Sequence, residues 1–274
     1  MRYVSVKEIR IYNGWHPIGE IRQTLKKVGE TFFQTPHAPL VDADYDGSII
    51  DDVKVYLDGE PIEPESVDPD TGLLSIYPPP AGDTQIEASY FWHPFGDGDI
   101  ELAVEAAEGL VEALTGVVYV PHRRVERCPL KRGNVIILSE PVISIESVKI
   151  FDSMGNLLDD GVEAEVVDGP SGTIRLKKLL DGPRPPWYLP QTAEAEIIYR
   201  AGFSEVPAAV KQAVLALASY NLLTRLQQKI SFSTDYGGAV AAVFTSHEIE
   251  KRLILLKTQA EKMLNSLPRR VERV

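Results

Sequence analysis

The chain has 274 residues, 44% of them hydrophobic and 25% charged, with a single cysteine and a formal net charge of −12. This length and apolar fraction suit one large or two modest domains, and no apolar stretch is long enough for a membrane span or an export signal. One cysteine excludes an internal disulfide and a cysteine-based structural zinc site, and the acidic balance argues against sequence-independent adhesion to nucleic acid.

A short helix is one of two structures that fit the N-terminal residues. Ser5–Glu8 has the form of a capping box and Asn13-Gly14 has the form of a helix stop, which predicts a helix over residues 5–13. The same residues alternate well enough for a strand. Residues 18–30 also fit either a helix or a strand.

Residues 17–95 predict a small β domain. Short apolar runs between Phe32 and Trp92 are separated by turn signals, of which Asp58-Gly59 is typical of a hairpin and Pro69–Gly72 of a second turn. Several short strands in this arrangement are typical of a sandwich or a barrel.

Most of the negative charge lies in this β region, where eleven carboxylates and one base, Lys54, occur between Asp42 and Asp70. Asp42, Asp44 and Asp46, followed by Gly47, match the first half of a calcium loop, because alternate carboxylates can converge on one cation. The position that should supply a bidentate glutamate holds Val53. A solvated acidic turn is therefore the alternative interpretation.

An amphipathic helix and a second β region follow. Apolar residues recur at spacings of four and three and predict a helix over residues 98–115: Ile100, Val104, Ala107, Val111 and Leu114. The β region covers residues 117–200, and its best strands are 135–138, 142–150, 162–167, 173–176 and 195–199.

The one basic cluster of the sequence precedes these strands, in a segment that we interpret as a loop. Arg123, Arg124 and Arg127 could contact phosphates or an acidic protein face, or they could simply be solvated. Cys128 lies in the same loop, and we interpret it as a structural thiol. No catalytic or phosphate-binding motif occurs and no histidine pair has helical metal-site spacing, so we expect no enzymatic activity and no cofactor.

The C-terminal third is predicted to be helical, over residues 206–225 and 246–267. The last helix has apolar residues at strict spacings of four and three, and those that we expect at an interface are Ile249, Leu253, Leu256, Ala260 and Met263. This stripe could pack into the chain's own helices or dock on a partner. A basic tail, residues 268–274, follows and adds Arg269, Arg270 and Arg273 as candidate interface residues.

The order of four phrases is more informative than any one of them. They are Gly98–Ala107, Leu138–Val148 (LSEPVISIESV), Ile197–Phe203 (IIYRAGF) and Val206–Ala213 (VPAAVKQA). In this order they resemble the head–tail connector proteins (adaptor or head-completion proteins) of long-tailed bacteriophages. The resemblance covers residues 1–16 and 96–267, whereas residues 17–95 depart from the family pattern and look like an inserted domain.

The resemblance implies a fold and a function. The expected fold is α+β, with a helical-bundle core of about four helices that carries two β insertions, one of them the small acidic sandwich-like domain. The expected function is a ring of about twelve subunits beneath the portal, extending the DNA channel and meeting a tail-proximal stopper or tail-completion protein. DNA would pass without sequence-specific binding, and the protein, made in the host cytoplasm, would reside in the virion. The alternative is a calcium-stabilised β-sandwich module that binds a carbohydrate or a cell surface.

Overall fold

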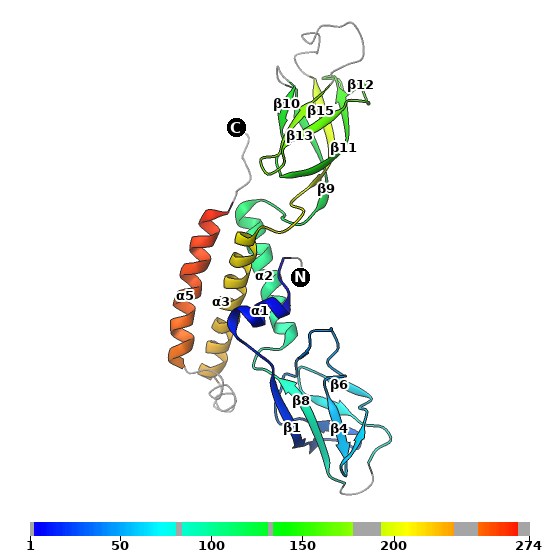
Figure 1. Cartoon of the computed structure of the whole chain (residues 1–274), viewed down its shortest axis with the longest axis vertical. Helices are drawn as coiled ribbons and strands as arrows, with labels where there is room; N and C mark the ends of the chain where they lie inside the picture. Colours follow the sequence, from blue (N-terminus) through cyan, green and yellow to red (C-terminus); the bar gives the residue numbers. More distant parts are fainter. Residues whose placement is uncertain (1–2, 81–83, 131–133, 178–192, 233–245, 268–274) are drawn as a thin grey trace. The chain divides into compact units, whose positions relative to one another are not determined.

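The computed structural model describes residues 3–80, 84–130, 134–177, 193–232 and 246–267. These residues form four helices and fifteen strands, which Figure 1 shows in their order along the chain. The chain divides into two compact units. The first unit contains residues 3–107 and 212–262, and the second contains residues 108–211 with the C-terminal residues from Met263.

Helix α1 (Val6–Asn13) begins at the capping box that the sequence predicts. The Glu8 backbone N–H donates to Ser5 Oγ at 3.2 Å, and the Ser5 N–H donates to Glu8 Oε2 at 2.8 Å. Gly14 ends the helix in the left-handed conformation, with φ of 68°. The capping box is therefore confirmed, and of the two structures that fit these residues the chain adopts the helix.

Two four-stranded antiparallel sheets follow in the first unit, in the orders β1-β8-β4-β5 and β2-β3-β7-β6. An apolar cluster that includes Val55, Leu74 and Tyr90 is formed by residues of both sheets. The strands are β1 (Ile18–Thr24), β2 (Lys26–Lys27), β3 (Phe32–Gln34), β4 (Lys54–Leu57), β5 (Glu60–Ile62), β6 (Ser66–Asp68), β7 (Leu73–Ser75) and β8 (Ile86–Trp92).

The turns of this β region lie where the sequence predicts them. Asp58 and Gly59, with φ of 49° and 92°, join β4 to β5, and Pro69–Gly72 joins β6 to β7. Strand β1 pairs with β8 so that Ile18 lies opposite Trp92. The chain therefore enters and leaves this β region at one place.

The second unit also contains two antiparallel sheets, in the orders β12-β11-β15-β9 and β10-β14-β13. Their apolar cluster includes Ile150, Ile174 and Ile197. The strands are β9 (His122–Pro129), β10 (Val135–Ile137), β11 (Val142–Phe151), β12 (Leu157–Asp159), β13 (Ala164–Asp168), β14 (Thr173–Leu176) and β15 (Glu194–Ala201).

The prediction of a loop around residues 121–129 is wrong. These residues form β9, which pairs with β15 from His122 opposite Ala201 to Pro129 opposite Glu194. Strand β9 lacks the apolar alternation of the other long strands, because half-buried charged residues occupy positions on it. Cys128 is buried in the apolar cluster of this unit.

Three longer helices complete the fold: α2 (Asp97–Thr115), α3 (Ala208–Phe232) and α5 (Ser246–Ser266). In the first unit, Leu222 and Leu226 of α3 line one cavity with Asp99 of α2, and Leu223 lines another with Ile249 of α5. Helix α3 therefore lies between the first turn of α2 and helix α5 (Figure 1).

The predicted fold class, α+β with a helical-bundle core carrying two β insertions, is wrong. The described residues form four antiparallel sheets beside the helices, and each unit has an apolar cluster built from its sheets. Several strands are only two to four residues long, so they give a much weaker periodic signal than a helix of about twenty residues. None of the helices in the described part of the chain has the length and apolar content of a membrane span.

Candidate assembly surfaces

The phrase Tyr199–Phe203 forms the junction between β15 and α3. Gly202 has φ of 96°, and a Cβ atom on it would lie 2.4 Å from the Val120 carbonyl oxygen. Phe203 stacks on Tyr119 with ring centroids 5.7 Å apart. Burial, followed by the adjacent Glu126 carboxylate, raises the pKa of Tyr199. The residues of this motif therefore have a structural role, packing the end of β15 against residues 119 and 120.

The arginines of β9 all face carboxylates. The Arg123 guanidinium donates to Glu146 at 2.9 Å, Arg127 donates to Glu196 at 2.7 Å, and Arg124 donates to the buried Glu140. Three cations and three carboxylates thus lie side by side in one unit. That Arg123, Arg124 and Arg127 contact a partner stays a prediction, but they do not form an uncompensated basic patch.

A partly buried polar cluster lies beside these arginines, and sequence reasoning missed it. The Glu126 carboxylate accepts hydrogen bonds from the Ser139 hydroxyl at 2.7 Å and from the Tyr199 hydroxyl at 2.9 Å. His122 lies 2.9 Å from the Glu140 carboxylate. These contacts satisfy polar groups that β9 carries in place of apolar ones. Spacing along the sequence gives no signal for such partners.

The predicted stripe of α5 is largely covered within the chain. Ile249, Leu256 and Ala260 are buried, and Leu253 and Met263 are partly buried. Arg269, Arg270 and Arg273 lie outside the described residues. Contact of these residues with a partner stays a prediction, although burial of the first three favours packing against the chain's own helices.

The outer face of α5 carries other apolar residues. Ile254 is 70% exposed and Leu255 is 56% exposed. Leu255 borders a cavity of about 600 Å³ that is also lined by Trp15, Leu223, Lys251 and Arg252. Arg252 donates to the Asn13 carbonyl oxygen and lies over the Trp15 ring, 5.8 Å from its centroid. Burial lowers the pKa of Arg252. We call Ile254, Leu255 and this cavity the α5 face.

Helix α2 also has an exposed apolar face. Ile100, Val104, Ala107 and Val111 are fully buried, as the periodicity predicts, but Leu114, the fifth residue of the predicted stripe, is exposed. Leu102, Leu110 and Leu114 are between 44% and 58% exposed. Ala106, Gly109 and Ala113 lie exposed among these leucines, and Glu101 and Glu105 run along one side. The helix contains no basic residue. We call this surface the α2 face.

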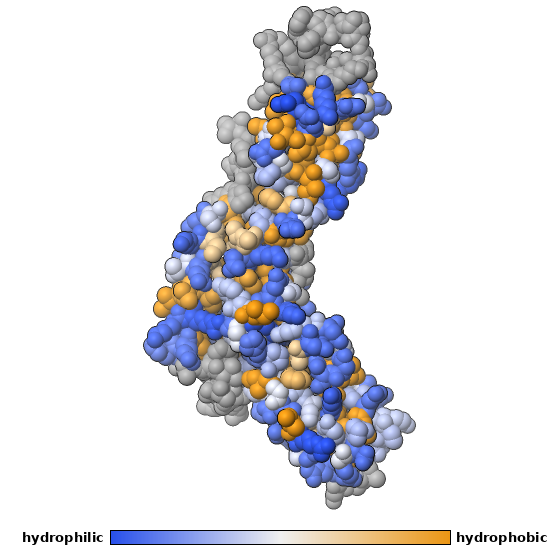
Figure 2. All heavy atoms as spheres, viewed as in Figure 1, coloured by the Kyte–Doolittle hydropathy of each residue, from blue (hydrophilic) through white to orange (hydrophobic). Residues whose placement is uncertain are grey.

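The sheets of the second unit expose further apolar side chains. Val135 and Ile137 of β10, Val166 and Val167 of β13 and Val125 of β9 are all partly exposed to solvent. Figure 2 shows hydrophobic side chains gathered among polar ones over the strands of this unit. Exposed apolar surface therefore occurs on sheets as well as on helices.

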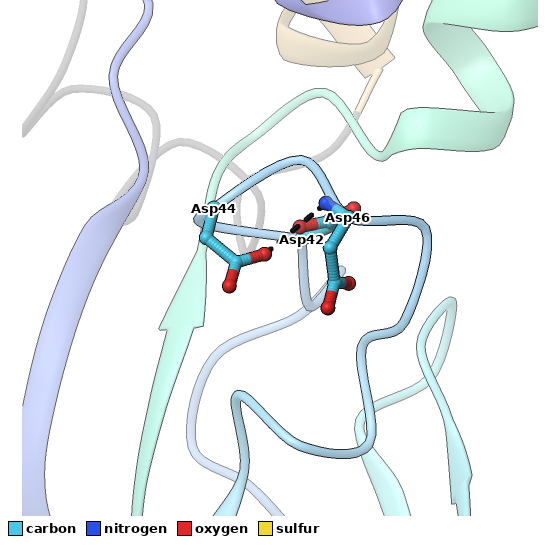
Figure 3. Close-up of side chains that lie close together, drawn as sticks. All are labelled: Asp42, Asp44 and Asp46. Atoms are coloured by element: carbon cyan, nitrogen blue, oxygen red, sulfur yellow. Dashed lines mark hydrogen bonds between the residues drawn. The ribbon is translucent and has the colours of Figure 1, made fainter.

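The acidic loop brings three carboxylates together. Asp42, Asp44 and Asp46 offer oxygen atoms that all lie within 4.8 Å of one another (Figure 3). Asp42 accepts hydrogen bonds from the backbone N–H groups of Tyr45 and Gly47, at 2.5 and 2.7 Å. Asp44 accepts one from the Asp46 N–H at 3.1 Å. The loop conformation is thus explained by its own hydrogen bonds, and calcium binding stays a prediction.

Comparisons with known proteins give matches among solved structures. No protein-family model and no curated protein matches the sequence. Eleven chains of solved structures match. A chain of the "Neck of empty GTA particle computed with C6 symmetry" is 17% identical, covers 65% of this chain and 80% of its own, and has a TM-score of 0.33.

Two further matches come from related particles. A chain of the "Neck of native GTA particle computed with C12 symmetry" is 16% identical over 64% of this chain and 84% of its own, with a TM-score of 0.33. A chain of the "Virion of native gene transfer agent (GTA) particle" is 19% identical over 65% and 80%, with a TM-score of 0.32. At TM-scores this low the likeness gives no evidence of function.

Proposed function

We propose that this chain is a non-enzymatic structural protein of a virion, a head–tail adaptor that forms a ring of about twelve copies beneath the portal. In this role it extends the DNA channel and joins the capsid vertex to the tail. The portal protein binds on one side of the ring, and a stopper or tail-completion protein binds on the other.

The exposed apolar surface of α2 is the observation that carries this proposal. Soluble monomers rarely leave a contiguous apolar patch uncovered, and such patches mark interaction surfaces. Leu102 and Leu110 lie off the buried side of this helix of 19 residues, and Leu114 is exposed near its C-terminal end. Packing among the described residues leaves this second apolar face of the helix uncovered, and the face suits contact with another copy.

The kind of assembly follows from the sequence phrases and from the charge. The four phrases occur in the order typical of head–tail connectors. The net charge is −12, and the arginines of β9 are each matched by a glutamate. Such a chain opposes phosphate contact, which suits a channel through which DNA must pass without sticking.

Electron microscopy tests the proposal directly. The full-length chain is imaged alone and mixed with the portal protein of the same virus. We expect rings, alone or on the portal, with a symmetry that matches the portal. A chain that forms no ring in either sample and does not bind the portal would refute the adaptor role.

The calcium-stabilised binding module is the second candidate, and the three converging carboxylates of the acidic loop favour it. Titration calorimetry with calcium separates the two functions. A tight site that Asp44→Ala abolishes would support the module, and its absence would remove it.

A further inference from the structure

Two faces of this chain expose apolar side chains and differ in the charges beside them. We propose that the α2 face of one copy docks on the α5 face of the next copy, and that this contact builds the ring. The inference rests on the proposed function and deepens it, because it assigns the two surfaces that meet.

The α2 face presents a row of small and leucine side chains with an acidic edge. Leu102, Ala106, Gly109 and Ala113 follow one another at spacings of four, three and four, so they share one side of the helix. Glu101 and Glu105 lie beside this row, and neither carboxylate has an ion-pair partner in the described part of the chain. A partner for this face must therefore offer apolar surface next to cations.

Gly109 gives independent support for a close neighbour. A glycine inside a helix costs roughly 0.5–1 kcal/mol relative to alanine. A Cβ atom on Gly109 would have no atom within 4 Å, so packing within this chain does not require a glycine there. A second helix lying close against α2 in the assembly would require it, because only small residues allow backbones to approach.

The α5 face supplies what the α2 face lacks. Ile254 and Leu255 are exposed, and the cavity beside Leu255 is lined by Trp15 and bordered by Lys251 and Arg252. A leucine side chain of the neighbouring copy would occupy part of this cavity. Tryptophan and arginine around a cavity are typical anchors of protein interfaces.

Charge complementarity favours a second copy as the occupant. The exposed charged residues around Ile254 are Lys251, Lys257 and Lys262 against Glu250 and Glu261, and Arg252 and Glu248 add one charge of each sign at the cavity. This balance is net positive, whereas the α2 face carries carboxylates alone. Lys251 and Lys257 would then pair with Glu101 and Glu105 of the neighbouring copy, which favours contact between these two faces.

The placement of the helices explains why such a contact gives a ring. Helix α3 separates the first turn of α2 from α5, so the two faces lie on different helices. A contact between two different surfaces is heterologous and repeats from copy to copy, and it gives a ring when the rotation between copies closes. A contact of one face with itself would stop at a dimer.

Two blocked variants and their mixture test this pairing. Leu102→Lys/Leu110→Lys blocks the α2 face, and Ile254→Glu/Leu255→Glu blocks the α5 face. Mass photometry and sedimentation velocity, at concentrations where the wild-type chain forms rings, measure the assemblies. We expect each variant alone to be monomeric, with a Kd raised by about 30-fold or more, and the 1:1 mixture to give heterodimers through the two intact faces.

Two controls separate blocked docking from misfolding. Gly109→Gln replaces a helix breaker with a good helix former, so it should raise thermal stability and still abolish rings. Met154→Lys changes a residue that is 86% exposed on a turn of the second unit, and it should leave rings unchanged.

The outcomes distinguish the two proposals. Rings that persist in both blocked variants, or a blocked variant that dimerises alone, overturn the pairing of faces and leave the adaptor role standing. A wild-type chain that forms no ring alone or on the portal overturns the adaptor role, and the pairing with it.

Discussion

The ion pair between Arg10 and Asp97 ties together α1, the start of α2 and the acidic loop. The Arg10 side chain has no exposed surface, whereas the Asp97 side chain is 19% exposed. Arg10 Nη2 donates to Asp97 at 2.7 Å and to the Phe95 carbonyl at 3.0 Å, and Asp97 also accepts the Asp42 N–H at 2.9 Å. Asp97→Ala leaves a buried guanidinium with only a carbonyl partner. We expect it to lower the free energy of unfolding of the first unit by about 3–5 kcal/mol.

The reverse truncation should cost less. Arg10→Met fills similar space and removes Nη1, a buried donor that has no hydrogen-bond partner in the described residues. It leaves Asp97, which reaches water and keeps the Asp42 N–H as a donor. We expect a loss of about 1–2 kcal/mol, and a double variant that loses less than the sum of the two.

Urea unfolding followed by tryptophan fluorescence measures both effects, because Trp15 lies against Phe95 with ring centroids 4.5 Å apart. Lys7→Ala is the matched control on the same helix as Arg10, since it removes only a cation–π contact of an exposed lysine with Tyr45 and should cost less than about 1 kcal/mol. A smaller loss for Asp97→Ala than for Arg10→Met would refute this reasoning.

Three further predictions concern single residues. Burial, followed by the nearby Arg10 charge, lowers the pKa of His93 from 6.5 to about 3. Between pH 6.5 and pH 3 the unfolded chain therefore binds a proton at this residue that the folded chain does not bind. As the pH falls, the free energy of unfolding of the first unit should decrease by up to about 1.4 kcal/mol per pH unit. His93→Asn keeps an acceptor for the Phe95 N–H and should reduce this pH dependence in urea titrations. Gly202→Ala should lower the free energy of unfolding by at least about 2 kcal/mol, because the added Cβ atom would clash with the Val120 carbonyl oxygen. An unchanged Tm would contradict this prediction. Asp42→Ala should cost about 1–3 kcal/mol by orphaning two backbone N–H groups and should speed hydrogen exchange at the Gly47 amide, whereas the exposed Asp44→Ala should do neither.

Local features of the fold could be predicted because they depend on neighbouring residues. The capping box at Ser5 and the hairpin at Asp58-Gly59 are each determined by residues a few positions apart in the sequence. The buried side of α2 is determined by apolar residues that repeat every three or four positions. The fold class could not be predicted in this way. A clear helical period shows that a helix is amphipathic, but it does not show whether helices or sheets surround the core.

The features that sequence reasoning missed depend on partners far along the chain. Strand β9 carries Arg124 and Glu126 where apolar residues would mark a strand, because Glu140 and Tyr199 satisfy them. Helix α2 does carry a signal that could have revealed its exposed face. Leu102 and Leu110 fall off the buried stripe, so the helix is apolar on more than one side.

The pairing of β1 with β8 means that the residues between these strands could be replaced as one block. Because Ile18 lies opposite Trp92, the chain returns to within one strand spacing of where it departed. If the residues between β1 and β8 were deleted or replaced, a short hairpin could join the two strands and leave the flanking helices in position. Mutation can therefore remodel this β region while the flanking helices keep their geometry.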